Sequence, residues 1–100
     1  MTETQSIKKT KLNVNEVKKI EKHIKSATFL LVKDYYGDSI MEVDKKDKRK
    51  TNLKIYKAII RKIHQEYKVT HLKKIQWFDY VDVMMYIDSL TIDDLKYFLQ

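Results

Sequence analysis

Apolar residues recur at intervals of three and four along most of this chain, which is the spacing of helices that bury one face. The first series consists of Val17, Ile20, Ile24, Ala27, Leu31 and Tyr35. Asn13 or Asn15 precedes it and can cap a helix, because a short side-chain carbonyl accepts hydrogen bonds from the first free backbone amides. Gly37 follows where a left-handed C-cap residue belongs. The pattern therefore predicts a long first helix.

A second series predicts the clearest helix of the chain. Its apolar positions are Leu53, Tyr56, Ile60, Ile63 and Tyr67, with Ile59 at the margin. Thr51 or Asn52 is the expected cap. Residues 38–50 before it form a highly charged connector, and the pattern leaves open whether they add a turn of helix or run extended.

The remaining residues predict shorter elements. Residues 68–75 read as a turn or very short helix, and residues 76–89 as a third helix. Thr91 has the position of an N-cap, with Asp93 and Asp94 in the first turn of a last short helix. The expected fold is all-α, a compact bundle of four to five helices over residues 13–100, preceded by a flexible tail over residues 1–12.

Composition agrees with this fold class and excludes several functions. The chain has one glycine and no proline, although sandwiches and barrels use both at many turns. A glycine-rich phosphate-binding loop needs more than one glycine, so this chain cannot contain one. The absence of cysteine excludes disulfides and thiolate metal sites. The longest purely apolar run, residues 29–32, is far too short for a membrane span. We expect a soluble, intracellular protein.

The basic residues are concentrated in the middle of the chain. The net charge is +7, and residues 45–74 hold 12 basic against 2 acidic residues. Lys50, Lys54, Lys57, Arg61 and Lys68 fall on one side of the second helix, and other basic residues flank it. A cluster of this kind is what phosphate neutralisation requires. The predicted nucleic-acid-binding residues are Lys45, Lys46, Lys48, Arg49, Lys50, Lys54, Lys57, Arg61, Lys68, Lys73 and Lys74.

A simpler interpretation competes with nucleic-acid binding. Lysines line the solvated face of many helices, and 19 lysines against 2 arginines resemble the codon bias of an AT-rich genome. Lysine also contacts phosphate as a point charge, whereas arginine is the better reader of base edges. If the patch binds nucleic acid, we expect weak sequence discrimination, and DNA is the expected form.

The carboxyl-terminal part is acidic and rich in aromatic residues and methionine. We expect the core to take Trp77, Phe78, Val81 and Met85. The others then remain for a partner surface or for pairing two chains, because aromatic residues and methionine are enriched in interfaces. These predicted interface residues are Tyr80, Met84, Tyr86 and Tyr97.

Neither a metal site nor an enzyme is expected. His23, His64 and His71 have no recognised ligand spacing with carboxylates, and His23 is expected to pack at the flank of the first helix. Helix capping and solvated faces account for the carboxylates, and no serine or lysine nucleophile has a visible base. We expect no cofactor, no metal and no catalytic residue.

Three blocks of the sequence, residues 12–20, 54–69 and 77–87, resemble the carboxyl-terminal domain of phage antirepressor-like regulatory proteins, the "ORF-six" C-terminal family. In the middle block Tyr56, Ala58, Ile59, Tyr67 and Val69 occupy the family's characteristic places. Lys68 replaces the usual glycine, and the tryptophan that often follows the closing isoleucine is missing. The resemblance implies a phage or mobile-element protein that regulates genes in the cytoplasm of a bacterial host cell. In the family this domain usually follows a separate DNA-binding module, whereas here it is expected to stand alone.

These observations support two functions. The first is a regulatory protein of transcription or replication that binds nucleic acid through a basic helix face. The alternative is an antagonist or adaptor that sequesters a host protein, as an anti-defence or host-takeover factor.

Overall fold

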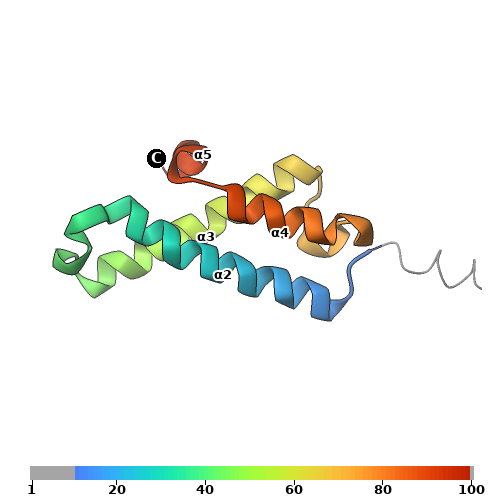
Figure 1. Cartoon of the computed structure of the whole chain (residues 1–100), viewed down its shortest axis with the longest axis horizontal. Helices are drawn as coiled ribbons and strands as arrows, with labels where there is room; N and C mark the ends of the chain where they lie inside the picture. Colours follow the sequence, from blue (N-terminus) through green and yellow to red (C-terminus); the bar gives the residue numbers. More distant parts are fainter. Residues whose placement is uncertain (1–10, 100) are drawn as a thin grey trace, which may run out of the picture.

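The structure, a computed structural model, describes residues 11–99 and is an all-α bundle (Figure 1). The elements in chain order are α2 (Val14–Tyr36), η1 (Gly37–Glu42), α3 (Lys45–Tyr67), η2 (Leu72–Lys74), η3 (Trp77–Asp79), α4 (Tyr80–Ser89), α5 (Ile92–Leu95) and η4 (Lys96–Leu99), where η denotes a 3-10 helix. The described residues contain one isolated antiparallel bridge, between Lys11 and Gln76. The predicted fold class is confirmed.

Helices α2 and α3 form an antiparallel hairpin that η1 connects at one end (Figure 1). Helix α4 begins at the end of the hairpin opposite η1 and runs alongside α2 toward the η1 end. It also contacts α3. Helix α5 and η4 pack against the middle of the hairpin, mainly on α3. The two long helices therefore carry the bundle, and the short carboxyl-terminal helices cover one of its sides.

The core is made largely of isoleucine. Both hairpin helices and α4 contribute side chains that are 1% exposed or less, which are Ile20, Ile24, Ile55, Ile59, Ile63, Val83 and Ile87. Thr28 is the polar residue among the buried ones, and its hydroxyl donates to the Ile24 carbonyl at 2.7 Å. In the described part of the chain, no buried side-chain nitrogen or oxygen lacks a hydrogen-bond partner.

Helix α2 begins as the sequence predicts. The Asn13 side chain accepts from the Glu16 backbone amide at 2.8 Å, and the Glu16 carboxylate accepts from the Asn13 amide at 2.9 Å, which together make a capping box. The predicted tail is wrong at its last two residues. Leu12 is buried, and its amide donates to the Ile75 carbonyl at 3.2 Å, so Lys11 and Leu12 belong to the fold. The first ten residues of that tail lie outside the described range.

Helix α2 ends at Tyr36 with Gly37 as its C-cap, as predicted, but Gly37 does not take the left-handed helical conformation that was expected there. The φ of Gly37 is 56° and its ψ is −135°, a conformation that residues with a Cβ rarely adopt. Tyr35, which was expected on the apolar face, is instead 49% exposed. Its neighbour Tyr36 turns inward, and the Tyr36 hydroxyl lies 2.5 Å from the Thr51 hydroxyl. The end of α2 is thereby joined to the first half of α3.

Helix α3 starts earlier than predicted. It begins at Lys45 with Asp44 as the N-cap, so residues 45–50 are helical and Thr51 and Asn52 lie inside the helix. The apolar periodicity missed this start because residues 45–52 contain no apolar side chain. Cations near the amino end of a helix also oppose its dipole. Tyr36, whose hydroxyl also donates to the Asp47 carbonyl at 3.4 Å, packs against this charged turn.

The buried side of α3 also differs from the prediction. Ile55, Ala58, Ile59 and Ile63 are buried, whereas Leu53 is 53% exposed. Ile59, which was placed at the margin, is at the centre of the buried side. Tyr56 and Ile60 are partly buried at its edge. Apolar residues line two neighbouring sides of this helix at helical spacing. The spacing alone did not show which of the two sides α2 and α4 cover.

Lys68 ends α3 in the left-handed conformation, with φ 54° and ψ 47°. Its backbone amide donates to the His64 carbonyl, so Lys68 fulfils the C-cap role that glycine usually has. For a residue with a Cβ this conformation costs about 1–2 kcal/mol. After it, η2 is the predicted short turn, with Leu72 and Ile75 buried. Thr91 caps α5, as predicted, in a capping box with Asp94.

Replacing Ile59 tests which side of α3 is buried. Ile59→Ala leaves a cavity among fully buried side chains, so we expect the free energy of unfolding to fall by about 2–5 kcal/mol. Leu53→Ala removes an exposed side chain and is the matched control, with an expected loss below about 1 kcal/mol. Urea titration followed by circular dichroism measures both. Equal losses would contradict the burial of Ile59 and the exposure of Leu53.

Replacing Lys68 tests the strain at the end of α3. Lys68→Gly relieves the Cβ penalty but gives the unfolded chain more freedom, so the expected net gain in unfolding free energy is about 0.5–1 kcal/mol. Lys68→Ala keeps the Cβ and is expected to gain nothing. The same urea titrations compare the two variants, and a loss of stability in the glycine variant would refute the strain.

Candidate nucleic-acid interface

The predicted basic residues do not form one continuous surface. Because α3 begins at Lys45, the amino-terminal lysines are helical and point to different sides. Lys46, Lys50, Lys54, Lys57 and Arg61 follow one another at spacings of three and four, so they line one side of α3. All five are exposed. We call these five residues the basic ridge.

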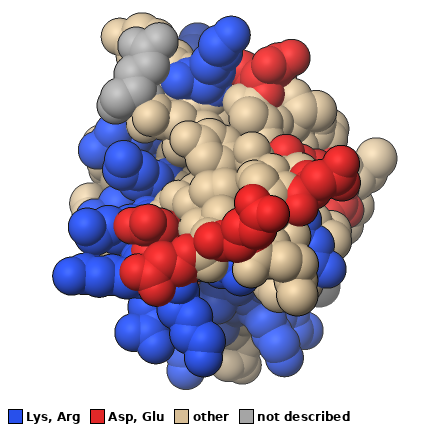
Figure 2. Space-filling view, turned by 90° about the vertical axis from the view of Figure 1, so that its left-hand side faces the viewer, with Lys and Arg blue, Asp and Glu red and all other residues tan. Residues whose placement is uncertain are grey.

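The basic ridge is free to bind an anion. Lys50, Lys54, Lys57 and Arg61 were predicted to share one helix face, and α3 places them so, with Lys46 in line. Among the residues that the structure describes, no carboxylate lies within 4.0 Å of a ridge cation. Figure 2, which views the η1 end, shows many Lys and Arg on the left and along the bottom, with a band of Asp and Glu beside them across the middle. No ridge cation is therefore held in an ion pair within the described residues.

Three further predicted residues lie at the carboxyl end of α3 or beyond it. Lys68 is the C-cap and leaves the ridge line, and Lys73 and Lys74 belong to η2. Lys68 and Lys74 line a small polar pocket of about 360 Å³ together with Lys11 and Asp79. The helical wheel had aligned Lys68 with the ridge because it assumed that α3 continued.

Lys48 and Arg49 face a groove rather than the ridge. They line an open depression of about 970 Å³ between α2, η1 and α3. Its apolar lining residues are Phe29, Val32, Ile40, Met41, Leu53 and Tyr56. Its cations are Lys25, Lys33, Lys48 and Arg49, and the Lys33 ammonium lies 4.6 Å from the centre of the Phe29 ring. We call this depression the hairpin groove. Lys45, the first residue of α3, is exposed and does not line it.

His64 adds little to the charge of this region at neutral pH. His64, in the last turn of α3, has a pKa below its usual value because it is partly buried and because His71 lies nearby. It is therefore mostly neutral at pH 7. Protonation would have to overcome both effects, so the permanent cations of lysine and arginine define the interface.

The predicted partner surface is largely reversed in the structure. Tyr80, Met84 and Tyr86 are partly buried and pack against the core, while Tyr97 is 79% exposed, as an interface residue would be. The four residues expected in the core are exposed instead, with Trp77 at 46%, Phe78 at 66%, Val81 at 64% and Met85 at 66%. We call Trp77, Phe78, Val81 and Met85 the α4 surface. Helix α4 buries Val83 and Ile87, so its opposite side faces solvent.

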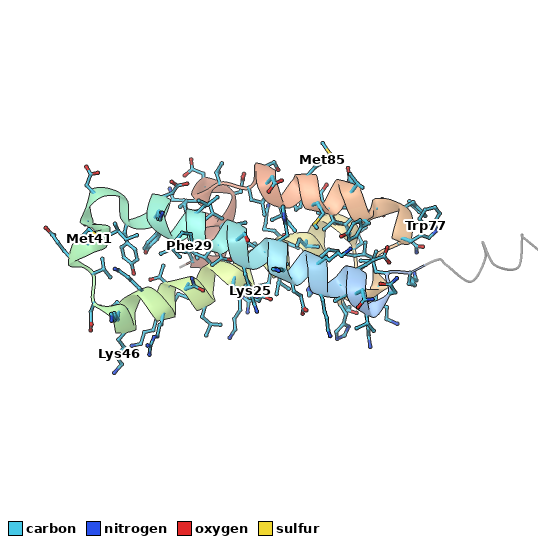
Figure 3. The ribbon with its side chains drawn as sticks, turned by 60° about the horizontal axis from the view of Figure 1, so that its bottom comes forward. Lys25, Phe29, Met41, Lys46, Trp77 and Met85 are labelled. Carbon is cyan, nitrogen blue, oxygen red and sulfur yellow. The ribbon has the colours of Figure 1, made fainter. Side chains whose placement is uncertain are left out.

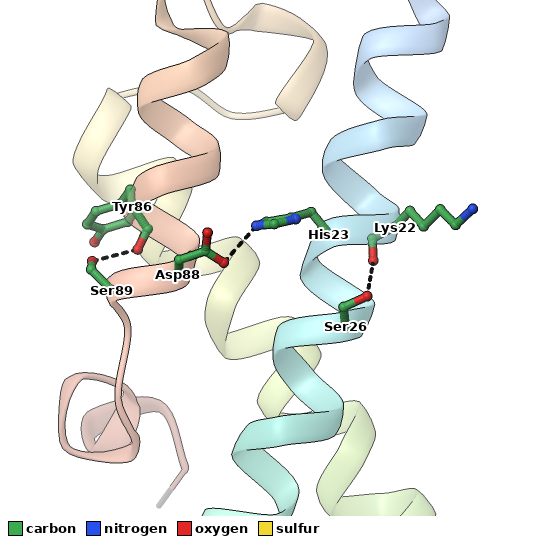
Figure 4. Close-up of polar contacts among 6 residues, drawn as sticks. All are labelled: Lys22, His23, Ser26, Tyr86, Asp88 and Ser89. Carbon is green, nitrogen blue, oxygen red and sulfur yellow. Dashed lines mark hydrogen bonds and ion pairs between the residues drawn. The ribbon is translucent and has the colours of Figure 1, made fainter.

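Two hydrogen bonds orient α4. The Tyr67 hydroxyl donates to the Asp82 carboxylate at 2.5 Å, and burial together with this bond raises the pKa of Tyr67 well above its usual value. His23 on α2 lies 2.8 Å from Asp88, between Nε2 and Oδ1, near the carboxyl end of α4 (Figure 4). His23 was expected simply to pack on the helix flank. Together these contacts tie both ends of α4 to the hairpin and leave its outer side free.

The described residues offer neither a membrane span nor a metal site. Within residues 11–99, no helix is both long enough and apolar enough to cross a bilayer. In the same range, no group of three histidine, aspartate or glutamate residues is placed to hold a metal ion.

Comparison with protein-family models, curated proteins and solved structures finds no match to this chain. The resemblance to phage antirepressor-like regulators is therefore neither supported nor opposed by a known relative. It stays a prediction from the sequence blocks that carry it.

The fluorescence of Trp77 tests the exposure of the α4 surface. It is the one tryptophan of the chain, so its emission reports this position alone. In dilute solution we expect the emission of a partly hydrated indole, with acrylamide quenching well above that of a buried tryptophan and below that of the urea-unfolded chain. A blue-shifted emission protected from quenching would show that Trp77 lies in the core after all.

Proposed function

We propose that the protein binds nucleic acid through the basic ridge of α3 and acts as a small regulator of phage or mobile-element genes in the bacterial cytoplasm. The observation that carries the proposal is the ridge itself. It presents five exposed cations on one side of a single helix, with no carboxylate within ion-pair distance in the described chain.

The spacing of the ridge suits a line of phosphates. Neighbouring ridge residues are three or four positions apart, which corresponds to about 5–6 Å along a helix. From Lys46 to Arg61 the ridge extends about 22 Å. A nucleic-acid strand carries a negative charge every few ångströms along the same length. Several phosphates can therefore be neutralised at once, with release of their counterions.

The chemistry of the ridge favours affinity over sequence recognition. Four of its five cations are lysines, which contact phosphate as flexible point charges. Arg61 is the one ridge residue with the planar donors that read guanine edges. A regulator built this way gains most of its binding energy from the backbone and needs a further contact, or a second bound copy, to select a site.

The alternative function, an antagonist or adaptor of a host protein, draws on a different observation. The α4 surface exposes four large apolar side chains, and exposed apolar clusters commonly mark protein interfaces. We favour nucleic-acid binding over the host-protein function because the ridge charges have no partner within the described chain. Direct binding to a duplex separates the two functions.

Salt-dependent binding to a random duplex tests the proposal. Five phosphate contacts predict a slope of about −4.5 for log K against log salt, a loss on the order of 500-fold between about 50 and 200 mM salt. Fluorescence anisotropy of a labelled duplex measures this. Lys54→Glu/Lys57→Glu/Arg61→Glu is expected to abolish most binding at the lower salt. Any binding that remains is expected to depend less steeply on salt, with a slope between about −2 and zero.

The matched control reverses three exposed lysines on α2, as Lys18→Glu/Lys19→Glu/Lys22→Glu, which changes the net charge by the same amount. It is expected to keep most of the slope. Equal loss in both variants would show that overall charge, rather than the ridge, attracts the duplex. No binding by the unmodified protein at the lower salt would overturn the proposal, and a host protein recovered in pull-downs would then favour the antagonist.

A further inference from the structure

Two apolar surfaces of the molecule have no partner within the described chain. One is the hairpin groove, where Phe29 is 59% exposed, Leu53 53% and Met41 87%. The other is the α4 surface. Figure 3 shows Met41 at the η1 end and Trp77 at the opposite end, with Phe29 and Lys25 between α2 and α3. Exposed apolar area of this kind on a small protein commonly marks a docking surface.

The hairpin groove combines an apolar floor with a cationic rim. Its lining includes four cations, namely Lys25, Lys33, Lys48 and Arg49, and no carboxylate. The Lys33 ammonium is held over the Phe29 ring, so a positive charge stands beside the apolar floor. The chemistry of this groove calls for an occupant that is apolar along one face and acidic beside it.

Helix α4 presents a surface of that chemistry. Val81 and Met85 lie one turn apart on its outer side, and Phe78 in η3, directly before α4, extends the apolar row. Side chains at such spacings anchor an amphipathic helix in a groove. Asp82 lies beside them and is exposed although it accepts from Tyr67, and residues 75–100 hold 5 acidic against 1 basic residue. The groove and the α4 surface therefore match each other in both polarity and charge.

The two surfaces cannot meet within one molecule. The groove is lined by residues of α2, η1 and α3 alone, and none of its lining residues belongs to α4 or α5. Helix α4 is tied to the hairpin through Tyr67–Asp82 and His23–Asp88, with its apolar outer side turned away. Within residues 11–99, neither surface therefore has a complementary partner.

We infer that the α4 surface of one copy docks in the hairpin groove of a second copy. The contact joins two different surfaces, so each bound copy still offers one free groove and one free α4 surface, and assembly continues as a chain or closes as a ring. A single ten-residue helix provides less than a standard interface, so the association is weak and depends on concentration. This inference does not depend on the proposed nucleic-acid binding.

Sedimentation velocity without nucleic acid tests the association. Between about 1 µM and about 1 mM, a span that covers weak contacts, the unmodified protein is expected to pass from monomer to dimer and larger species. Emission from Trp77 is expected to shift to the blue over the same range, because docking covers part of the α4 surface. A monomer at the highest concentration would overturn the inference, and would leave a foreign acidic helix as the candidate for the groove.

Two paired variants identify the surfaces. Val81→Gln/Met85→Gln removes two apolar anchors from α4, and Phe29→Gln/Leu53→Gln removes two from the groove. All four positions are more than half exposed and lie in helices, and glutamine is neutral and a good helix former. Each variant alone is expected to associate at least tenfold more weakly than the unmodified protein.

Mixing the two variants gives the decisive result. The first keeps an intact groove and the second an intact α4 surface, so an equimolar mixture is expected to form dimers of one copy each and to stop there. A mixture that stays monomeric would overturn the inference. Unchanged association of the groove variant would also overturn it, because α4 would then pair with α4.

Two control variants change residues outside both docking surfaces. Val14→Gln/Tyr97→Gln removes exposed apolar side chains there, and it is expected to associate like the unmodified protein. The ridge variant Lys54→Glu/Lys57→Glu/Arg61→Glu is expected to associate at least as well, because it lowers the net positive charge. Loss of association in the ridge variant, with its helical circular dichroism intact, would place the contact on the ridge side of α3 instead of in the groove and would refute the inference.

Discussion

The packing of isoleucine between α2 and α3 is the contact on which the rest of the molecule depends. Ile24 on one helix and Ile55 and Ile59 on the other are completely buried, and α4 adds Val83 and Ile87 to the same core. Helix α4 has ten residues and α5 has four, lengths that are not stable alone in water. They acquire their order from the hairpin, and so does every surface residue that they carry.

The hairpin also explains how one helix provides two kinds of basic surface. One side of α3 is buried, so its cations are distributed over the remaining sides. Those on the ridge face solvent alone, whereas Lys48 and Arg49 stand beside Phe29 and Leu53 in the hairpin groove. A cation beside an apolar floor favours an occupant that has both acidic and apolar groups. A row of cations in water favours a polyanion.

Much of the fold was predictable from the sequence because the signals for a helix, its apolar spacing and its capping residues, lie within the helix or directly beside it. The spacing of apolar residues indicated both long helices, and the caps at Asn13 and Thr91 were recognised from residue types whose short side chains bond to their own backbone. The start of α3 was not predictable in this way, since Tyr36 stabilises it from another element. Local patterns carry no signal from such a contact.

The candidate site was predictable in composition but not in arrangement. Four ridge cations were identified from the wheel of α3, and Lys68 was misplaced because the helix ends at its left-handed residue. The assignment of α4 was reversed for a related reason. Both of its sides carry large apolar residues, and the choice between Met84 and Met85 depends on where the hairpin lies. Periodicity cannot choose between two equally apolar sides.

The short connection between α2 and α3 has a consequence for how the chain folds. Eight residues, Gly37 to Asp44, separate the helices, so closing the hairpin costs little chain entropy. Contacts between neighbouring helices are local in sequence and form quickly. The chain contains no proline, so no prolyl isomerisation delays the process. The hairpin can therefore form first and present the apolar side on which α4 and α5 then pack. The elements would then fold in the order in which they occur in the sequence.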